Sequence, residues 1–280
     1  MSVESKIVNA ISAMDDTVKS VDDKVVKLEN TPFKGKWISI FGDSISTYAG
    51  WIPSENATWY PNNDVNDVTK TWWHKLLTKL GAKLCVNQSW SGRKVTDTSD
   101  TASAACNAIN KLHREAGKTY INLDGTTTTE TKEIKPDIIL IMLGINDFNN
   151  GVPVGDLNPI AQNTYSSTSF SDSYSSLLLD LQKIGAKYPN AKLYLMNICY
   201  SNKYINFGKQ NSGGSRLNDY RNCIDFHSGF MECNVIHMNR LGVTTTNGGS
   251  YLIDSLHPKA SMMTLIDNQC YKEMMASNCL

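Results

Sequence analysis

Residues 36–46 read Lys36-Trp37-Ile38-Ser39-Ile40-Phe41-Gly42-Asp43-Ser44-Ile45-Ser46. The part 37–41 is short, apolar and rich in β-branched and aromatic side chains, which indicates a central strand covered by helices on both sides. Gly42 permits a sharp exit from that strand. Because the carboxyl ends of parallel strands form the ligand crevice of an open sheet, Ser44 lies where a nucleophile would be placed. An aspartate and a serine after a strand can equally form a helix N-cap or an Asx turn, so these residues alone do not establish a catalytic role.

Strand-like segments alternate with helical patterns through the remainder of the chain. The strands are expected at 37–41, 83–87, 137–143, 192–198 and 234–238. The helices are expected at 71–80, 102–114, 174–188, 217–230 and 258–275. This alternation predicts an α/β fold, with a parallel sheet, right-handed crossovers and helices on both faces. Residues 117–135 interrupt the alternation and are expected to form a surface hairpin or loop.

The composition argues against several classes of protein. Lysine plus arginine equals aspartate plus glutamate, 27 each, and we see no long block of one sign, so neither nucleic acid nor an anionic membrane is an expected partner. The longest apolar run, 138–143, is too short to cross a bilayer. The seven cysteines never form a Cys-x-x-Cys pair and are expected to be mostly buried thiols. No signal peptide is visible, and a bacteriophage virion, bacterial cytoplasm and cell surface all remain open.

The first thirty residues carry a separate pattern, in which apolar side chains recur at alternating steps of four and three. The series is Ile7, Ile11, Met14, Val18, Val21, Val25 and Leu28. Such a narrow stripe with polar flanks predicts a coiled-coil helix, and β-branched residues at both core positions favour a homotrimer. A helix folded back on its own domain is the alternative. We therefore expect a coiled coil at 1–30, a linker at 31–35 and one globular domain at 36–280.

Three more short blocks complete a chemical set with the Gly-Asp-Ser block. They are Asn87-Gln88-Ser89-Trp90-Ser91-Gly92, Gly144-Ile145-Asn146-Asp147 and Asp254-Ser255-Leu256-His257-Pro258. Acyl transfer needs a nucleophile, a base, a carboxylate that orients the base, and donors for the developing oxyanion. Ser44, His257 and Asp254 are the candidates for the first three roles. The backbone amides of Ser44 and Gly92 and the side chain of Asn146 are the candidate oxyanion donors, and Asp147 is expected to be structural.

In their order and position these four blocks resemble those of the SGNH, or GDSL-like, hydrolase superfamily. Ile45 stands where the family name has Leu, Gly92 matches the second block, and 144–147 and 254–257 match the third and fifth. The resemblance implies a three-layer α/β/α sandwich around a five-stranded parallel sheet, flavodoxin-like in architecture. It also implies Ser44 as nucleophile, His257 as base and Asp254 as orienting acid, with no cofactor and no metal.

The expected activity is hydrolysis of short acyl esters, acetyl esters above all, on a small molecule or polysaccharide. Trp51, Trp90 and Arg93 are candidate substrate-binding residues, because aromatic faces stack on sugar rings and a cation could bind an acidic sugar. The alternatives are a thioesterase or short-chain lipase, and an oligomeric glycan-binding or attachment module of the phage-tail kind with little or no hydrolysis. His74, His113, His227 and His237 are expected to be structural or exposed.

Overall fold

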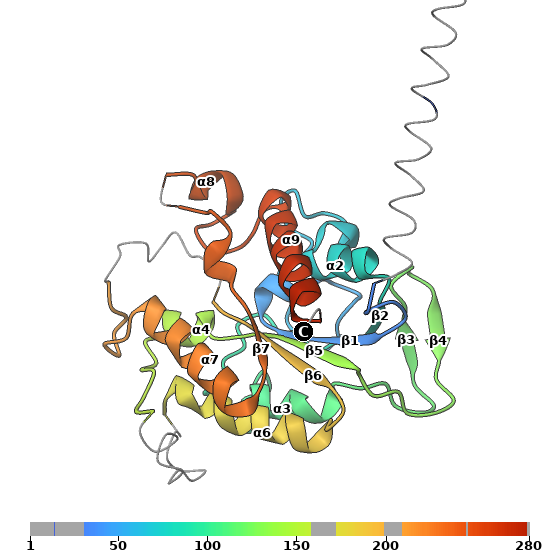
Figure 1. The fold of residues 1–280 in the computed structure, drawn as a ribbon, viewed down its shortest axis with the longest axis horizontal. Helices are drawn as coiled ribbons and strands as arrows, with labels where there is room; N and C mark the ends of the chain where they lie inside the picture. The colour runs from blue at the N-terminus through green and yellow to red at the C-terminus, as the bar shows by residue number, and fades with distance from the viewer. Residues whose placement is uncertain (1–13, 15–30, 158–171, 199–208, 245, 279–280) are drawn as a thin grey trace, which may run out of the picture.

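A computed structural model describes residues 14, 31–157, 172–198, 209–244 and 246–278. Its centre is a parallel sheet with the strand order β2-β1-β5-β6-β7 (Figure 1). The strands are β1 (Trp37–Gly42), β2 (Lys83–Asn87), β5 (Ile138–Met142), β6 (Lys192–Met196) and β7 (Asn234–Ile236). All five lie within or close to the segments expected from the sequence. The α/β prediction with a five-stranded parallel sheet is confirmed.

Helices cover both faces of this sheet (Figure 1). One face carries α2 (Trp72–Leu80) and α9 (Ala260–Ser277), and the other carries α3 (Ala105–Ala108), α6 (Leu177–Lys187) and α7 (Leu217–Met231). Two short helices, α4 (Ile145–Asn149) and α8 (Gly248–Tyr251), complete the described set. The three layers are those that the alternation of strands and helices predicts.

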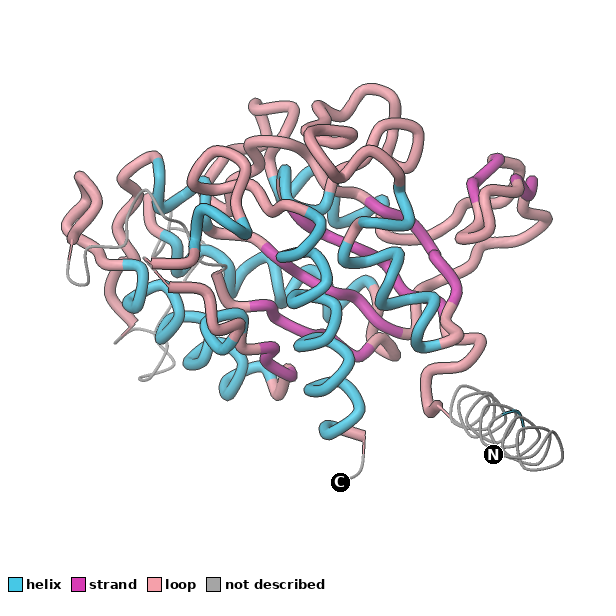
Figure 2. Tube along the Cα trace, turned by 90° about the horizontal axis from the view of Figure 1, so that it is seen from above, coloured by secondary structure: helices cyan, strands magenta, loops and turns pink. Residues whose placement is uncertain are grey.

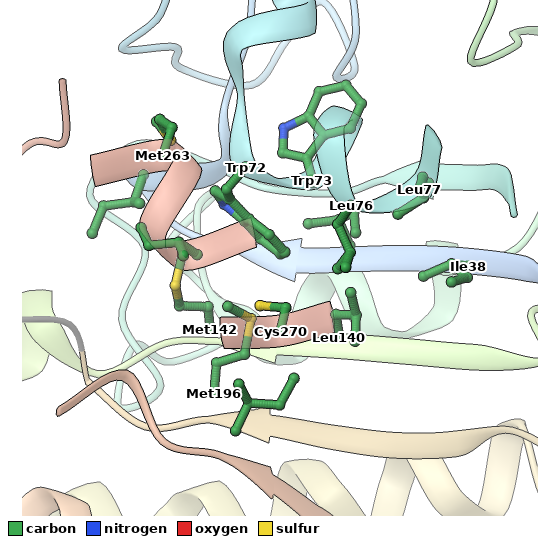
Figure 3. Packing of buried hydrophobic residues seen from close by; sticks show 14 of the residues in the cluster. Ile38, Trp72, Trp73, Leu76, Leu77, Leu140, Met142, Met196, Met263 and Cys270 are labelled. Atoms are coloured by element: carbon green, nitrogen blue, oxygen red, sulfur yellow. The ribbon is translucent and has the colours of Figure 1, made fainter. Parts of the chain in front are cut away.

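Each face of the sheet is sealed by its own apolar cluster. On the α2 and α9 side, Trp72 and Leu76 of α2 and Met263 of α9 are completely buried over β1 and β5 (Figure 3). On the other side, Leu181 and Tyr220 pack with Ile139 of the central strand β5. All five residues of β5 are buried, as its continuous apolar sequence requires of a strand covered on both faces. The sheet is therefore a rigid base for the loops at its carboxyl edge.

The segment 102–114 is less helical than its sequence suggests. The helix α3 ends at Ala108, and a 3-10 turn, Ile109–Lys111, follows it. Beyond this turn the chain makes contacts with distant elements, because the Leu112 amide donates to Tyr188 Oη at 3.1 Å and the Leu112 carbonyl accepts from Ser39 Oγ at 2.8 Å. These bonds replace the helical ones that a longer helix would have made.

The insertion at 117–135 contains a hairpin, as expected. The strands β3 (Thr119–Ile121) and β4 (Thr127–Thr129) pair antiparallel and stand at one end of the molecule, apart from the main sheet (Figure 2). Arg114 joins this hairpin to the edge strand β2. Its fully buried guanidinium donates to the carbonyls of Leu84 and Cys85, each at 2.7 Å, and to Glu130 at 2.7 Å. One arginine thus occupies carbonyls along the outer edge of β2.

The segment 31–35, expected as a linker, is packed onto the domain. Phe33 is 2% exposed within the apolar cluster beneath α2, and Thr31 Oγ1 donates to the Leu80 carbonyl at 2.6 Å. Residues 31–35 are therefore part of the globular unit. Of the expected coiled coil at 1–30, only Met14 belongs to the described residues, where it is helical and 68% exposed. Among the described helices none is long and apolar enough to cross a bilayer.

Candidate active site

Ser44 stands at the end of β1, between the neighbouring strands β2 and β5. It opens a buried 3-10 turn, Ser44–Ser46, which Asp43 caps by accepting a hydrogen bond from the Ile45 amide at 3.0 Å. The cap satisfies a backbone donor and fixes the turn in which the serine sits. The Ser44 side chain is thereby held at the carboxyl edge of the sheet, the position that the sequence predicts.

The block near the C-terminus brings a histidine and a carboxylate to this serine. His257 Nε2 lies 2.9 Å from Ser44 Oγ, and His257 Nδ1 lies 2.8 Å from Asp254 Oδ2. The other oxygen of Asp254 accepts from the backbone amides of Leu256 at 3.1 Å and His257 at 2.8 Å. Ser255, inside this tight turn, has a φ of +79°. The turn fixes carboxylate and imidazole in one orientation.

The protonation of these groups suits proton transfer from the serine. Burial lowers the pKa of His257 below its ordinary value, against the hydrogen bond and charge of Asp254, which raise it. Burial raises the pKa of Asp254, but the hydrogen bonds that His257 donates outweigh it and leave the pKa below its usual range. At neutral pH the carboxylate is ionised and the imidazole is neutral, with Nδ1 as donor and Nε2 free to accept.

Trp59 covers one face of the imidazole. Its indole is stacked on the His257 ring with centroids 3.6 Å apart and planes 11° from parallel. The backbone amide of Trp59 donates to Thr47 Oγ1 at 2.9 Å, which ties this residue to the turn that carries Ser44. The aromatic residues of the loop after Ser44 are evident in the sequence, but no spacing indicates which of them meets the histidine.

Two of the candidate oxyanion donors, Gly92 and Asn146, lie close together in the loops after β2 and β5. Asn146 Nδ2 donates to the Arg93 carbonyl at 3.0 Å, which places its amide beside Gly92. Gly92 has a φ of +87°, a conformation that glycine adopts without the cost imposed by a Cβ. Gly144 has a φ of +124°, and a Cβ there would lie 2.6 Å from Tyr174 Oη. Both glycines of the second and third blocks are thus required by backbone geometry.

Asp147 is structural, as expected from the sequence. It is completely buried and accepts hydrogen bonds from the Val95 amide at 3.1 Å, the Thr96 amide at 3.0 Å and the Thr96 hydroxyl at 2.8 Å. Burial raises its pKa to about 6, although these hydrogen bonds act the other way. The carboxyl group clamps the loop that follows β2 against the start of α4. Gly92 and Asn146 owe their closeness to this clamp.

The structure does not support Arg93 as a substrate-binding cation. Its side chain is 1% exposed and donates through Nε to the Ser103 carbonyl at 2.9 Å and through Nη1 to the Gln88 carbonyl. The guanidinium also lies 5.2 Å from the centre of the Phe41 ring. From the sequence alone, Arg93 and Lys94 would both be expected at the surface. In the structure Arg93 is buried and holds the loop through hydrogen bonds to backbone carbonyls.

The two tryptophans expected to bind substrate occupy different places. Trp90 is half-buried and lies in the loop that follows β2. Its backbone amide donates to the carbonyl of Gly42 at 3.1 Å, two residues before Ser44. Trp51 instead lies against α2, with its ring 5.8 Å from the rings of Trp73 and His74. It lines a cavity whose walls include no residue of the Ser44, His257 and Asp254 set.

The remaining histidines and the described cysteines belong to other parts of the fold. His74 contacts the Leu123 carbonyl, His113 contacts Tyr188, and His237 contacts Glu273, while His227 is completely buried. The described cysteines are all free thiols. Cys85, Cys223 and Cys270 are buried, and Cys106 and Cys233 are partly exposed. Within the described ranges no group of three or more histidine, cysteine or acidic side chains could hold a metal ion.

Comparison with known proteins identifies the family and related folds. The model of the GDSL-like Lipase/Acylhydrolase family matches residues 36–208. A protein of Bacteroides ovatus described as a GDSL-like lipase has a TM-score of 0.60 at 23% identity, over 87% of this chain and 99% of its own. A second, from Bacteroides uniformis, has a TM-score of 0.58 at 25% identity, over 85% and 94%.

A more distant likeness in fold is to an acetyl-xylooligosaccharide esterase from Geobacillus. Its TM-score is 0.51 at 18% identity, over 86% of this chain and 95% of its own. Comparison with curated proteins gives no match. The family model covers more than half of the chain, and the fold of the GDSL-like structures extends over most of the rest. The chain therefore belongs to the GDSL-like lipase/acylhydrolase family, within the SGNH hydrolase superfamily.

Proposed function

We propose that the protein is a serine esterase that removes short acyl groups, acetyl groups above all, from carbohydrate. The observation that carries this proposal is the unbroken chain of contacts from Ser44 Oγ to His257 Nε2 at 2.9 Å and from His257 Nδ1 to Asp254 Oδ2 at 2.8 Å. Serine acyl transfer uses this arrangement, in which the base lies within hydrogen-bonding distance of both the nucleophile and the orienting carboxylate.

In the proposed reaction Ser44 Oγ attacks the ester carbonyl while His257 Nε2 takes its proton. Asp254 holds the imidazole tautomer and stabilises the imidazolium. The tetrahedral oxyanion is met by the amides of Ser44 and Gly92 and by Asn146 Nδ2. Its collapse expels the alcohol, which takes the proton from His257 and leaves an acyl-enzyme. His257 then activates water, and hydrolysis releases the acid and restores Ser44.

The acyl group and its carrier are proposed on separate grounds. The described residues contain no long apolar helix over Ser44 of the kind that would cover a lipid chain, which favours a small acyl group. Trp59 is stacked on His257 and the backbone of Trp90 is bonded to Gly42 near Ser44, and aromatic faces suit sugar rings. The likeness in fold to an acetyl-xylooligosaccharide esterase supports the same choice.

The test is hydrolysis of p-nitrophenyl esters of increasing acyl length, with Ser44→Ala and Asn146→Ala measured beside the unmodified protein. We expect acetate to be the best substrate. Asn146→Ala should lower kcat/KM by about 10²- to 10³-fold, because one oxyanion donor is lost. Ser44→Ala should lower it by more than about 10⁴-fold, because the nucleophile is lost. The exposed Ser54→Ala serves as the matched control and should behave as the unmodified protein.

Three results would overturn the proposal. Near-normal turnover by Ser44→Ala would show that another group is the nucleophile. A preference for long acyl chains or for thioesters would favour a lipase or a thioesterase. Binding of glycan without cleavage of any ester would favour the glycan-binding module.

A further inference from the structure

A cavity of about 380 Å³ opens beside the outer edge of the sheet, away from Ser44 and His257. One wall is the edge strand β2 and its exit, residues 84–88. A second wall comes from the loop at 50–55, and a third from residues 111–121 at the base of the β3–β4 hairpin. Its volume lies in the range of sites that take small-molecule ligands.

The walls of this cavity combine ring faces with polar groups. Trp51, Pro53 and Tyr120 supply apolar and aromatic surface, and Gln88 and Thr119 supply hydrogen-bonding groups. A ligand with flat C–H faces and hydroxyl groups at its rim matches such walls, since each ring face can stack and each hydroxyl can find a partner. A sugar ring has this chemistry.

The charges around the cavity balance one another. Lys118 pairs with Glu115 at 2.7 Å, and Lys111 faces Glu55 at 4.0 Å. Burial lowers the pKa of His113, so this histidine adds no charge at neutral pH. The two cations and two anions that line the cavity leave it without net charge, so the lining gives no overall attraction to an anionic or cationic ligand. The cavity therefore suits a neutral sugar rather than an acidic one.

The aromatic rings of Trp51 and Tyr120 are held in place by other residues of the protein. The ring of Trp51 lies 5.8 Å from those of Trp73 and His74. Tyr120 accepts a hydrogen bond from the Glu115 amide at 2.8 Å, and the Arg114 guanidinium lies 5.3 Å from its ring. Side chains that are already fixed lose little conformational entropy when a ligand binds, which favours affinity.

Two connections link the cavity to the nucleophile. Asn87, which lines it, donates through Nδ2 to the Ser46 carbonyl at 2.9 Å, two residues from Ser44. The loop after Ser44 carries Trp51 at the cavity and, eight residues further on, Trp59 on His257. The same loop is tied to the exit of β2, where Ala57 accepts from the Ser91 amide at 2.8 Å.

We infer that this cavity is a binding subsite for a neutral sugar unit of the substrate, remote from the ester that Ser44 attacks. The inference rests on the proposed function, because it takes the sugar chain to be the carrier of the acyl group. A chain seated between Trp51 and Tyr120 would continue along the loop toward Trp59. The subsite would add binding energy for oligosaccharide esters that a small synthetic ester does not obtain.

The experiment is calorimetric titration of the full chain carrying Ser44→Ala with unacylated xylotetraose, cellotetraose and mannotetraose. We expect at least one of them to bind at millimolar concentration or below. In the same background, Trp51→Ala removes one ring face, and Ile52→Trp fills the cavity while leaving the packing on α2 in place. Both should weaken binding by about tenfold or more, since a factor of ten is about 1.4 kcal/mol.

Phe230→Ala, which removes an exposed aromatic ring on α7, is the matched control and should bind as the parent does. Thermal melting checks that each variant is folded. Absence of binding by all three oligosaccharides would overturn the subsite, and so would binding that neither Trp51→Ala nor Ile52→Trp weakens. The ester assay is read separately: hydrolysis that depends on Ser44 without oligosaccharide binding would refute the subsite and leave the esterase standing.

Discussion

The imidazole of His257 lies between two neighbours that act on its pKa in opposite directions. Asp254, 2.8 Å from Nδ1, favours the protonated ring and raises the pKa. Burial, to which the stacked indole of Trp59 contributes, favours the neutral ring and lowers it. The proposed reaction needs the neutral form as base, so its rate should fall at low pH as His257 becomes protonated.

Replacing Trp59 with leucine should move this acidic limb to higher pH. Loss of the stacked ring admits water to His257, and the pKa of the imidazole then returns toward its ordinary value of 6.5. The measurement is kcat/KM for p-nitrophenyl acetate against pH, for the unmodified protein, Trp59→Leu and Trp59→Phe. Trp59→Phe, which keeps a ring over His257, should retain most of the original profile. An acidic limb that stays in place in Trp59→Leu would contradict the assigned role.

Among individual residues, the sequence predicted those that a particular side-chain chemistry or backbone conformation requires. Ser44, His257 and Asp254 come together as expected, and Gly92 and Asn146 lie in adjoining loops. The sequence could not predict which polar side chains are buried. Arg93 reads like Lys94 beside it, yet only the folded loop shows that Arg93 is enclosed and bonded to carbonyls. The stack of Trp59 on His257 depends on the path of a loop, which no local pattern specifies.

The helix α6 carries a buried carboxyl group whose ionisation opposes folding. Asp180 is 5% exposed, and burial raises its pKa from 3.8 to about 7. Lys183 at 3.9 Å and Arg93 lower it, while Asp147 raises it. Between about pH 4 and pH 7 the unfolded chain releases this proton and the folded protein keeps it. The contribution of Asp180 to the free energy of unfolding therefore falls as pH rises through this window and is constant above it.

Asp180→Asn should remove this dependence. We expect the free energy of unfolding of the variant, relative to the unmodified protein, to increase by roughly 1–3 kcal/mol between about pH 4.5 and about pH 7.5. Urea denaturation at both pH values measures it, and the exposed Asp100→Asn is the control. A relative stability that is flat, or that falls with pH, would show that Asp180 is already ionised in the folded protein at the lower pH.

Among the helices and strands, the sequence predicted those whose hydrophobic pattern matches the set of side chains that are buried in the fold. The strand β5 is apolar throughout and buried throughout, so its periodicity could be interpreted without knowledge of its neighbours. The segment 102–114 was predicted too long as a helix, because Leu112 and Arg114 bond to Tyr188, Ser39 and β2. Tertiary partners that lie more than twenty residues away in the chain decided where that helix ends.

For the whole molecule, the heptad pattern at 1–30 predicts self-association, and that segment lies almost entirely outside the described residues. A chain of residues 31–280 keeps Thr31 and Phe33 in their contacts with the domain. We expect the full chain to be a trimer and the shortened chain a monomer by light scattering at micromolar concentration. The melting temperature of the domain and kcat/KM on small esters should be preserved. A monomeric full chain would refute the coiled coil, and a large fall in melting temperature on shortening would favour a helix folded back on the domain.

The buried guanidinium of Arg114 has a consequence for such an assembly. An unprotected edge strand is a template on which the edge strand of another molecule can add, and this is a common route to aggregation. Arg114 occupies the carbonyls of Leu84 and Cys85, and the hairpin stands beyond them. In copies held close together by the predicted coiled coil, the β2 edges would therefore not be free to pair with one another. The insertion that shapes the proposed sugar subsite would also keep crowded domains from pairing along this edge.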